Sequence, residues 1–281
     1  MVSKTGHPLP KPASSHAVEP SLVHIPALAL NLCLIPSNGR RTLLDVIRRW
    51  IAPGQQPANS VPNCPVAALD RRDRGDLLSA CPTAVFLRHP LHRLASAFNA
   101  RVVWGDDRRP VNAIKHEIAQ TYGLCPPHAN AAGLTFREFI LHCARTPDAD
   151  LHERWRPQAA FTEGLSIDFI GNAEALDTEV PHLAATLGHR PIMPLRAAPA
   201  VAPPTPWQGP SMSEVSSLNL RSAGLCPPPA ALFTPGLAEI ALDRYRADLD
   251  LLEAGGLIDE PARGPNALWA PAPEARPARA A

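Results

Sequence analysis

The order of apolar segments along this 281-residue chain predicts an α/β fold, with a mostly parallel central sheet flanked by helices. Short apolar runs at 30–35, 83–87 and 167–170 have the composition of buried strands, and helical periodicity follows each one. Strands that alternate with helices pair in parallel, and such sheets bind ligands at the carboxyl ends of their strands. Clusters of proline interrupt this pattern and predict irregular excursions from the regular fold.

Two strand–loop–helix units are predicted in the first half of the domain. In the first unit, the strand at 30–35 leads through a loop to a helix over 41–51, whose apolar residues share one side and which Pro53 ends. In the second unit, the strand at 83–87 leads to a helix whose apolar positions start after Pro90. Each unit therefore places a loop between the end of a strand and the start of a helix.

Helical patterns account for much of the remaining chain. Thr135 and Glu138 have the spacing of a capping box, in which each side chain accepts a hydrogen bond from the other residue's backbone amide. Gly188 is placed to end a helix in a left-handed conformation. The helices are expected at about 112–122, 178–187 and 237–252, the last as one continuous amphipathic helix.

Composition favours one domain with tails. The chain contains 34 prolines, which cluster near both ends and at 191–210 and 227–235. We expect disordered tails over 1–25 and 256–281 around a domain at 26–255, and we expect the two inner clusters to be poorly structured. The net charge of +1 provides no global field for binding nucleic acid or an anionic membrane.

Other features favour a soluble cytoplasmic protein without a metal site. The apolar stretch at 22–36 contains His24 and is too short to span a bilayer, and no secretory signal precedes it. The six cysteines have no paired spacing, which favours free thiols in a reducing compartment. His116 and Glu117 begin a zinc-binding pattern, but Gln120 stands where that pattern requires a second histidine.

The segment 86–98 has the arrangement of a phosphate-binding site. Arg88 follows the predicted strand, and Ser96 falls within the first two turns of the predicted helix. Both side chains can converge where the free amides of the helix start attract anions, and an arginine fork adds bidentate charged bonds. An amphipathic helix with solvated arginines is the alternative interpretation of these residues.

The same segment resembles the 3′-phosphate motif of sulfotransferases that use 3′-phosphoadenosine 5′-phosphosulfate (PAPS). The motif R-x-P-x-x-R-x-x-S-A-aromatic is formed here by Arg88, Pro90, Arg93, Ser96, Ala97 and Phe98. Further elements that resemble the Golgi carbohydrate sulfotransferases and their bacterial counterparts follow in order at 135–139, 155–158 and 168–176. The resemblance implies a P-loop-kinase-like fold, PAPS as co-substrate, a hydroxylated glycan-like acceptor and no metal. The Golgi members carry a membrane anchor, which we expect this chain to lack. The resemblance therefore points to a soluble bacterial relative of these enzymes.

The resemblance places the 5′-phosphosulfate at the loop after the first strand. The residues there are Ser37, Asn38, Gly39, Arg40, Arg41 and Thr42, where the family pattern is close to P-K-x-G-S/C-T-S. Gly39 permits a tight turn around a phosphate, but Ser37 stands at the position of the family lysine and Arg41 replaces a hydroxyl residue. We therefore predict that Arg40 or Arg41 supplies the missing positive charge in catalysis. An ordinary turn with exposed arginines is the alternative.

The sequence constrains the catalytic base and the acceptor site less tightly. Relatives often have a histidine directly before the tryptophan, where this chain has Arg154, so His152 is a candidate base only with a shift of two residues. Trp155 and Gln158 are candidates for lining the acceptor cleft, and a core position is the alternative for Trp155. Acceptor recognition is expected within 104–133 and 191–235, which depart most from regular patterning.

Other polar residues are expected to be structural or solvated. Asp70, Asp73 and Asp76 are the carboxylates available as a base between the two loops, but a solvated charge cluster is the favoured interpretation. We expect His89 and His92 on the surface at a helix start, and Asp168 and Glu174 in structural roles. None of them is assigned to the chemistry.

Three functions remain open from the sequence. The leading one is an active PAPS-dependent carbohydrate sulfotransferase. A non-catalytic nucleotide-binding or scaffolding relative is the alternative, because Ser37 replaces the family lysine. A P-loop kinase-like enzyme ranks last, because the chain contains no G-x-x-x-x-G-K-[ST] motif.

Overall fold

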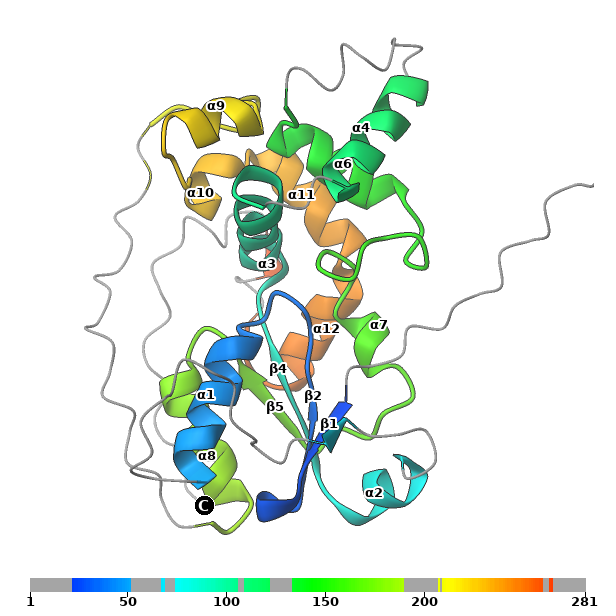
Figure 1. Ribbon diagram of the computed structural model, residues 1–281, viewed down its shortest axis with the longest axis vertical. Helices are drawn as coiled ribbons and strands as arrows, with labels where there is room; N and C mark the ends of the chain where they lie inside the picture. Colours follow the sequence, from blue (N-terminus) through cyan, green and yellow to red (C-terminus); the bar gives the residue numbers. More distant parts are fainter. Residues whose placement is uncertain are drawn as a thin grey trace, which may run out of the picture.

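A five-stranded sheet with helices on both faces forms the centre of the computed structural model (Figure 1). The strands, in the spatial order β3-β1-β2-β4-β5, are β1 (Leu22–Ile25), β2 (Leu30–Cys33), β3 (Ala67–Ala68), β4 (Thr83–Leu87) and β5 (Phe169–Asn172). The structure describes residues 22–51, 67–68, 74–105, 109–121, 133–189, 207, 209–259 and 263–264. The predicted α/β class is confirmed, whereas the P-loop-kinase-like detail stays a prediction.

The sheet is parallel in its centre and along one edge only. β4 pairs in parallel with both β2 and β5, as the alternation of strands and helices predicts. β1 pairs antiparallel with β2, with Leu22 opposite Cys33, and also antiparallel with β3. The expectation of a mostly parallel sheet is therefore too broad, because β1 and β2 form a hairpin through the short 3-10 helix Pro26–Leu28. Strand β1 also lies within the segment 1–25 that the sequence assigns to a disordered tail.

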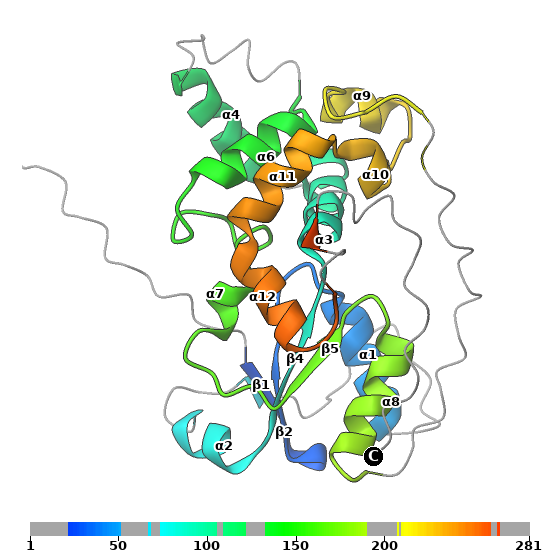
Figure 2. The same cartoon turned by 180° about the vertical axis from the view of Figure 1, so that it is seen from behind.

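Helices α1 and α8 cover one face of the sheet. α1 (Arg40–Ile51) follows β2 and α8 (Leu176–Thr186) follows β5, and the two lie side by side in both views (Figures 1 and 2). They pack on a cluster of strand residues that includes Leu32, Ala84 and Phe86. Both helices lie where the sequence predicts them, and Gly188 follows α8 with a left-handed φ of 70°.

Helices α7 and α12 lie over the other face, and most of the remaining helices pack beyond the carboxyl ends of the parallel strands (Figure 2). The helices over this face are α7 (Ala159–Thr162) and α12 (Arg246–Ala254). Those beyond the carboxyl ends are α3 (Pro90–Ala97), α4 (Arg109–Thr121), α6 (Phe136–Arg145), α9 (Ser217–Ser222), α10 (Pro229–Leu232) and α11 (Pro235–Arg244). α2 (Arg74–Ala80) precedes β4 and lies at the opposite end of the strands (Figure 1). α3 continues directly into a π-helix over Phe98–Val103. The predicted capping box of α6 is confirmed, since the Thr135 amide donates to Glu138 Oε2 at 2.8 Å and the Glu138 amide donates to Thr135 Oγ1 at 3.2 Å.

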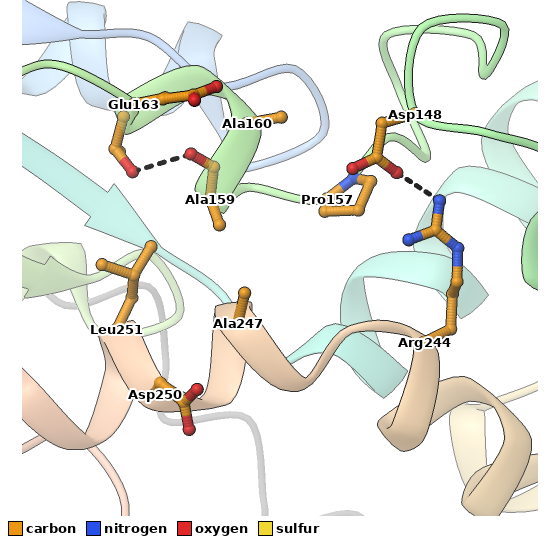
Figure 3. A pocket seen from close by; sticks show the side chains of 10 residues that line it. Asp148, Pro157, Ala159, Ala160, Glu163, Arg244, Ala247, Asp250 and Leu251 are labelled. Carbon is orange, nitrogen blue, oxygen red and sulfur yellow. Dashed lines mark hydrogen bonds and ion pairs between the residues drawn. The ribbon is translucent and has the colours of Figure 1, made fainter.

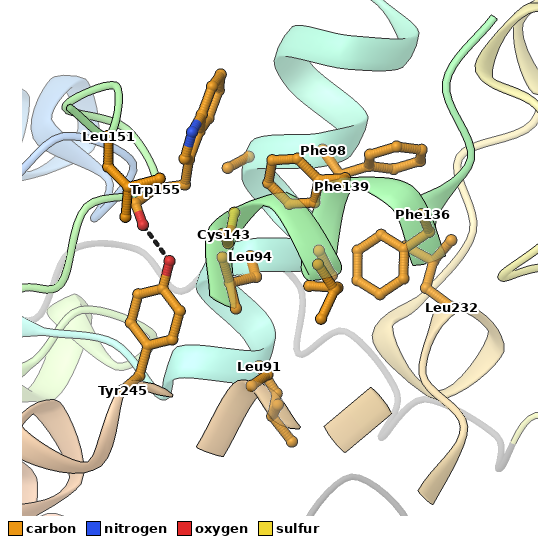
Figure 4. Packing of buried hydrophobic residues seen from close by; sticks show 14 of the residues in the cluster. Leu91, Leu94, Phe98, Phe136, Phe139, Cys143, Leu151, Trp155, Leu232 and Tyr245 are labelled. Carbon is orange, nitrogen blue, oxygen red and sulfur yellow. Dashed lines mark hydrogen bonds between the residues drawn. The ribbon is translucent and has the colours of Figure 1, made fainter. Parts of the chain in front are cut away.

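Aromatic side chains join these helices in the larger of two hydrophobic cores (Figure 4). Phe98 packs edge-on against Phe136, which in turn packs edge-on against Phe233. Phe139 makes a T-shaped contact with Trp155, which is 1% exposed. Because large buried rings dominate core energetics, these contacts fix α6 and the segment around Trp155 to the helix that follows β4.

The closing amphipathic helix differs from its prediction. The segment 237–252 forms two helices, α11 and α12, which meet at Tyr245. Tyr245 is buried and donates its hydroxyl hydrogen to the carbonyl oxygen of Trp155. The break between the helices therefore coincides with a polar anchor, which apolar periodicity alone does not reveal.

The proline cluster at 227–235 is more regular than the sequence predicts. Pro229 and Pro235 occupy the first turns of α10 and α11, positions where a missing amide hydrogen has no consequence. Leu232 and Phe233 between them are buried in the core. The expectation of poor structure is wrong here, whereas most of the cluster at 191–210 lies outside the described residues.

We predict that Gly171→Ala destabilises the protein, because a β-carbon on this residue of β5 would lie 2.7 Å from the ring of Phe86 in β4. Overpacking of this kind costs about 1–3 kcal/mol, which should lower the urea midpoint of unfolding. Gly236→Ala in α11 is the control, because the corresponding β-carbon has no neighbour within 4 Å, and its stability should change by less than about 0.5 kcal/mol. Equal stabilities of the two variants would contradict this packing.

Candidate functional site

Two loops lie side by side at the carboxyl edge of the parallel strands. The first, at 36–39, joins β2 to α1, and the second, at 88–89, joins β4 to α3. β2 and β4 are neighbouring parallel strands, with Cys33 opposite Val85, so both loops leave the sheet at the same edge. The sequence prediction of two strand–loop–helix units is confirmed.

The first loop takes a tight turn that is anchored from inside. Ser37 and Gly39 both have left-handed backbone angles, with φ of 70° and 71°. Glycine adopts this conformation without penalty, whereas serine is strained in it. Asn38 between them is buried and donates from Nδ2 to the Phe86 carbonyl at 2.9 Å and to Gln158 Oε1 at 2.6 Å. Asn38 therefore holds the turn in place and does not reach a ligand through its Nδ2.

Gln158 ties the two loops together. Its Oε1 accepts from Asn38 and also from the backbone amide of Arg88 at 3.0 Å. Its Nε2 donates to the Arg88 carbonyl at 2.8 Å and to Asp248 Oδ2 at 3.1 Å. The prediction that Gln158 lines the acceptor cleft is corrected, because the side chain is fully buried. Its amide group makes all of these hydrogen bonds to the two loops and to α12.

Arg93 clamps the first loop from its other side. This guanidinium is buried and donates from Nε to the Pro36 carbonyl at 3.3 Å. Its Nη atoms donate to the carbonyls of Arg156 at 2.7 Å and Glu153 at 3.4 Å. Burial lowers the pKa of Arg93, and Asp248 opposes that shift. Arg93 therefore acts as a structural cation that brings the segment 153–156 against the start of the first loop.

Arg88 points to a carboxylate beside the second loop. Its Nε donates to Glu174 Oε1 at 3.1 Å, and His92 Nδ1 lies 2.8 Å from the same oxygen. Burial would raise the pKa of Glu174, but the hydrogen bond and charge of His92, together with Arg88, outweigh it and lower this pKa to about 2. Ser96 is half-buried near the end of α3. The assignment of Arg88 and Ser96 to a 3′-phosphate stays a prediction.

Four arginines gather around the first loop and form what we call the arginine cluster: Arg40, Arg41, Arg101 and Arg154. Arg40, Arg41 and the neighbouring Thr42 are exposed at the start of α1, whereas Arg101 in the π-helix and Arg154 are half-buried. None of the four guanidinium groups makes a hydrogen bond or an ion pair with another side chain in the described part of the chain. Burial lowers the pKa of Arg154, and the positive charges of Arg101, Arg40 and Arg41 add to this effect.

Sequence patterns do not identify two members of the arginine cluster, Arg154 and Arg101, as site residues. Arg154 is noted only as a departure from the histidine of relatives, and Arg101 carries no motif. A signal for Arg101 is its place in the π-helix Phe98–Val103, a feature often found at functional sites. Sequence spacing alone does not bring these residues to the loop at 36–39, because α3 and the Arg93 clamp do so through space.

Trp155 and His152 occupy positions that change their predicted roles. Trp155 is a core residue that stacks on the His152 ring at 4.5 Å, so the prediction that it lines the acceptor cleft is corrected in favour of the core alternative. His152 Nδ1 accepts a hydrogen bond from the Arg154 amide at 3.2 Å. In the neutral ring this bond places the proton on Nε2 and leaves no free lone pair for base catalysis. The role of His152 as base stays a prediction that this geometry does not favour.

Asp168 and Asp76 lie away from the two loops. Asp168 Oδ2 accepts from the Thr83 amide at 2.8 Å at the start of β4, the end of the strand opposite the loops, which supports its expected structural role. Asp76 is exposed on α2, which precedes β4 and lies at that same end (Figure 1). Asp70 and Asp73 lie outside the described residues. Within the described ranges, no group of three or more histidines, cysteines or carboxylates is arranged to hold a metal ion.

A hollow of about 560 Å³ lies between α7 and α12, on the other side of the sheet from α1 (Figure 3). Its rim includes the ion pair between Arg244 and Asp148 and the carboxylates of Glu163 and Asp250. It contains none of the residues predicted to bind the nucleotide.

Among the described residues, no helix has the length and apolar character that a membrane crossing requires.

Comparison with known proteins gives one match. Residues 71–194 match the profile of the sulfotransferase family. The matched segment includes the motif from Arg88 to Phe98 and the elements at 135–139, 155–158 and 168–176, so the resemblance found in the sequence is confirmed over this part of the chain. The first loop at 36–42 lies outside it. Neither a curated protein nor a solved structure matches the chain.

We predict that the Glu174 contacts stabilise the protein at neutral pH and lose this effect in acid. The folded-state pKa of Glu174 is about 2, below the ordinary value of 4.5, so its contribution is complete above pH 4.5 and disappears as the pH falls toward 2. Glu174→Gln should therefore cost about 1–2 kcal/mol at pH 7 and progressively less below pH 4.5.

Urea unfolding at pH 7, 5, 4 and 3 measures this difference. Glu239→Gln is the control, because Glu239 is exposed on α11. The control should differ little from the parental protein at any of these pH values. A stability gap for Glu174→Gln that is as large at pH 3 as at pH 7 would disprove the assignment.

Proposed function

We propose that this chain transfers a sulfuryl group from PAPS to a hydroxyl of a carbohydrate or carbohydrate-bearing acceptor. The sulfotransferase match over residues 71–194 supports sulfotransfer as the activity. The observation that supports the finer proposal is the joint placement of two strand-to-helix loops at one edge of the sheet, tied together by Gln158. A donor with phosphate groups at both ends of its nucleoside requires two such loops at a fixed separation.

The 3′-phosphate of PAPS is assigned to the second loop. Arg88 supplies charged hydrogen-bond donors, one of which, Nε, is paired with Glu174 in this structure. Ser96 on α3 adds a neutral donor, and α3 begins directly after the loop with Pro90 in its first turn. His92 adjoins the same carboxylate and enlarges the positive surface when it is protonated.

The 5′-phosphosulfate is assigned to the first loop and the start of α1. The first turn of α1 contains no acidic residue, so its free amides and positive dipole end are available to an anion. Arg40 and Arg41 are exposed there, and Thr42 adds a hydroxyl group. Ser37 lies in the same turn and can donate one neutral hydrogen bond.

The reaction joins an acceptor oxygen to sulfur while the bond from sulfur to the bridging phosphate oxygen breaks. The products are a sulfate ester, 3′-phosphoadenosine 5′-phosphate (PAP) and the proton of the acceptor hydroxyl, which leaves to solvent or to a base. Negative charge grows on the departing 5′-phosphate as this bond breaks. Arg40 and Arg41 are placed to stabilise that charge, and alignment of the acceptor supplies much of the remaining rate.

We predict that Arg88→Ala weakens PAP binding by about 2–4 kcal/mol and that Ser96→Ala weakens it by about 1 kcal/mol. Calorimetric titration measures both losses. Adenosine 5′-phosphosulfate lacks the 3′-phosphate, so its affinity should be insensitive to either change. Arg49→Ala, at the other end of α1, serves as a charge-matched control.

The outcomes separate the functional alternatives. Equal losses of affinity for PAP and for adenosine 5′-phosphosulfate would contradict the 3′-phosphate assignment. Binding of PAPS without transfer of labelled sulfate to any member of a glycan panel would favour a non-catalytic nucleotide-binding relative. Failure of the parental protein to bind PAP would rule out both functions.

A further inference from the structure

Arg154 is held rigidly against the first loop. Its backbone amide donates to His152 Nδ1 at 3.2 Å, and its neighbour Trp155 is buried in the core. The carbonyls on either side, those of Glu153 and Arg156, both accept from Arg93, which also binds the Pro36 carbonyl. One guanidinium therefore holds the backbone around Arg154 next to the residue that opens the first loop.

Arg101 approaches the same place from a third element. It lies eight residues after Arg93 on the continuous α3 and π-helix, so the two residues share approximately one side of this helix. The arginine cluster thus draws its members from α1, from the π-helix and from the segment at 152–156. Glu153, the adjacent residue, is the carboxylate whose charge acts on Arg154 in the opposite direction.

A group of unpaired like charges destabilises a folded protein unless an anion binds among them. The arginine cluster has no side-chain hydrogen bond or ion pair within the described ranges, and Arg154 and Arg101 are only half-exposed. These two guanidinium groups come from the π-helix and from the segment at 152–156, and they add a second positive wall next to Arg40 and Arg41 on α1. Such a wall fits a ligand with negative charge at its outer end.

We propose that Arg154 is a catalytic residue that binds the sulfuryl oxygens of PAPS and adds, together with the arginines at the start of α1, to the positive charge that Ser37 cannot supply. This assignment rests on the proposed function and deepens it. The sulfuryl group carries its negative charge on three non-bridging oxygens throughout the transfer from phosphate to acceptor oxygen. A guanidinium fork is suited to bind two of them at once and to align the group for attack. Arg101 supports Arg154 in this wall.

Titration of the full-length chain with PAPS and with PAP tests the assignment. PAP has no sulfuryl group, so Arg154→Ala should bind PAPS at least tenfold more weakly and PAP less than threefold more weakly. Arg154→Lys, which keeps the charge but loses the fork, should give an intermediate loss. Arg49→Ala is the control and should match the parental protein for both nucleotides. Because the Arg154 side chain makes no hydrogen bond within the described residues and lies among like charges, the thermal unfolding temperature of Arg154→Ala should not fall.

A rescue experiment tests the relation to the missing lysine. Transfer of labelled sulfate to a glycan panel should fall at least a hundredfold in Arg154→Ala, and the added change Ser37→Lys should recover at least tenfold of that loss. Arg154→Ala that binds PAPS as tightly as Arg49→Ala, or that loses PAPS and PAP affinity equally, would overturn the assignment and leave the proposed function standing. A parental protein that binds neither nucleotide would overturn both.

Discussion

The hydrogen bonds of one buried amide, that of Gln158, determine how the site is assembled. Oε1 accepts from Asn38 and from the Arg88 amide, while Nε2 donates to the Arg88 carbonyl and to Asp248. A carboxamide has both donors and acceptors and carries no charge, so it can join two loops inside a core where a charged group would be expensive. Because the bonds reach the loop after β2, the loop after β4 and helix α12, the spacing of the two loops is set within the core.

Buried charges next to this amide complete the frame. Asp248 is fully buried, accepts from the Ala159 amide at 2.8 Å, and has its pKa raised by burial against the opposing charge of Arg93. Arg93 in turn donates to three carbonyl oxygens, because a buried guanidinium requires partners for its N–H groups. Inside the frame the cation Arg93 is occupied, whereas the arginine cluster outside it makes no ion pair within the described part of the chain. The fold thus separates structural cations from those available to a ligand.

Local patterns predict much of this structure. The strand–loop–helix order, the capping box of Thr135 and Glu138, and the loop positions all follow from periodicity and short-range chemistry. The burial of Trp155 and Gln158 does not follow from local patterns. A motif shows which residue types recur, but it does not show whether they face a cleft or the core. Arg154 is brought to the site through Arg93, whose contacts join segments about 60 residues apart in the chain. The break at Tyr245 likewise depends on a distant carbonyl, that of Trp155.

The central claim is that Gln158 holds two loops at the separation that one nucleotide requires. A crystal structure of the full-length chain bound to PAP tests it most directly. Our account predicts the 3′-phosphate on Arg88 and Ser96, the 5′-phosphate at the loop 37–42, and the Gln158 hydrogen bonds retained. A nucleotide bound elsewhere, or bound only after the Gln158 bonds have broken and the loops have moved apart, would contradict the account.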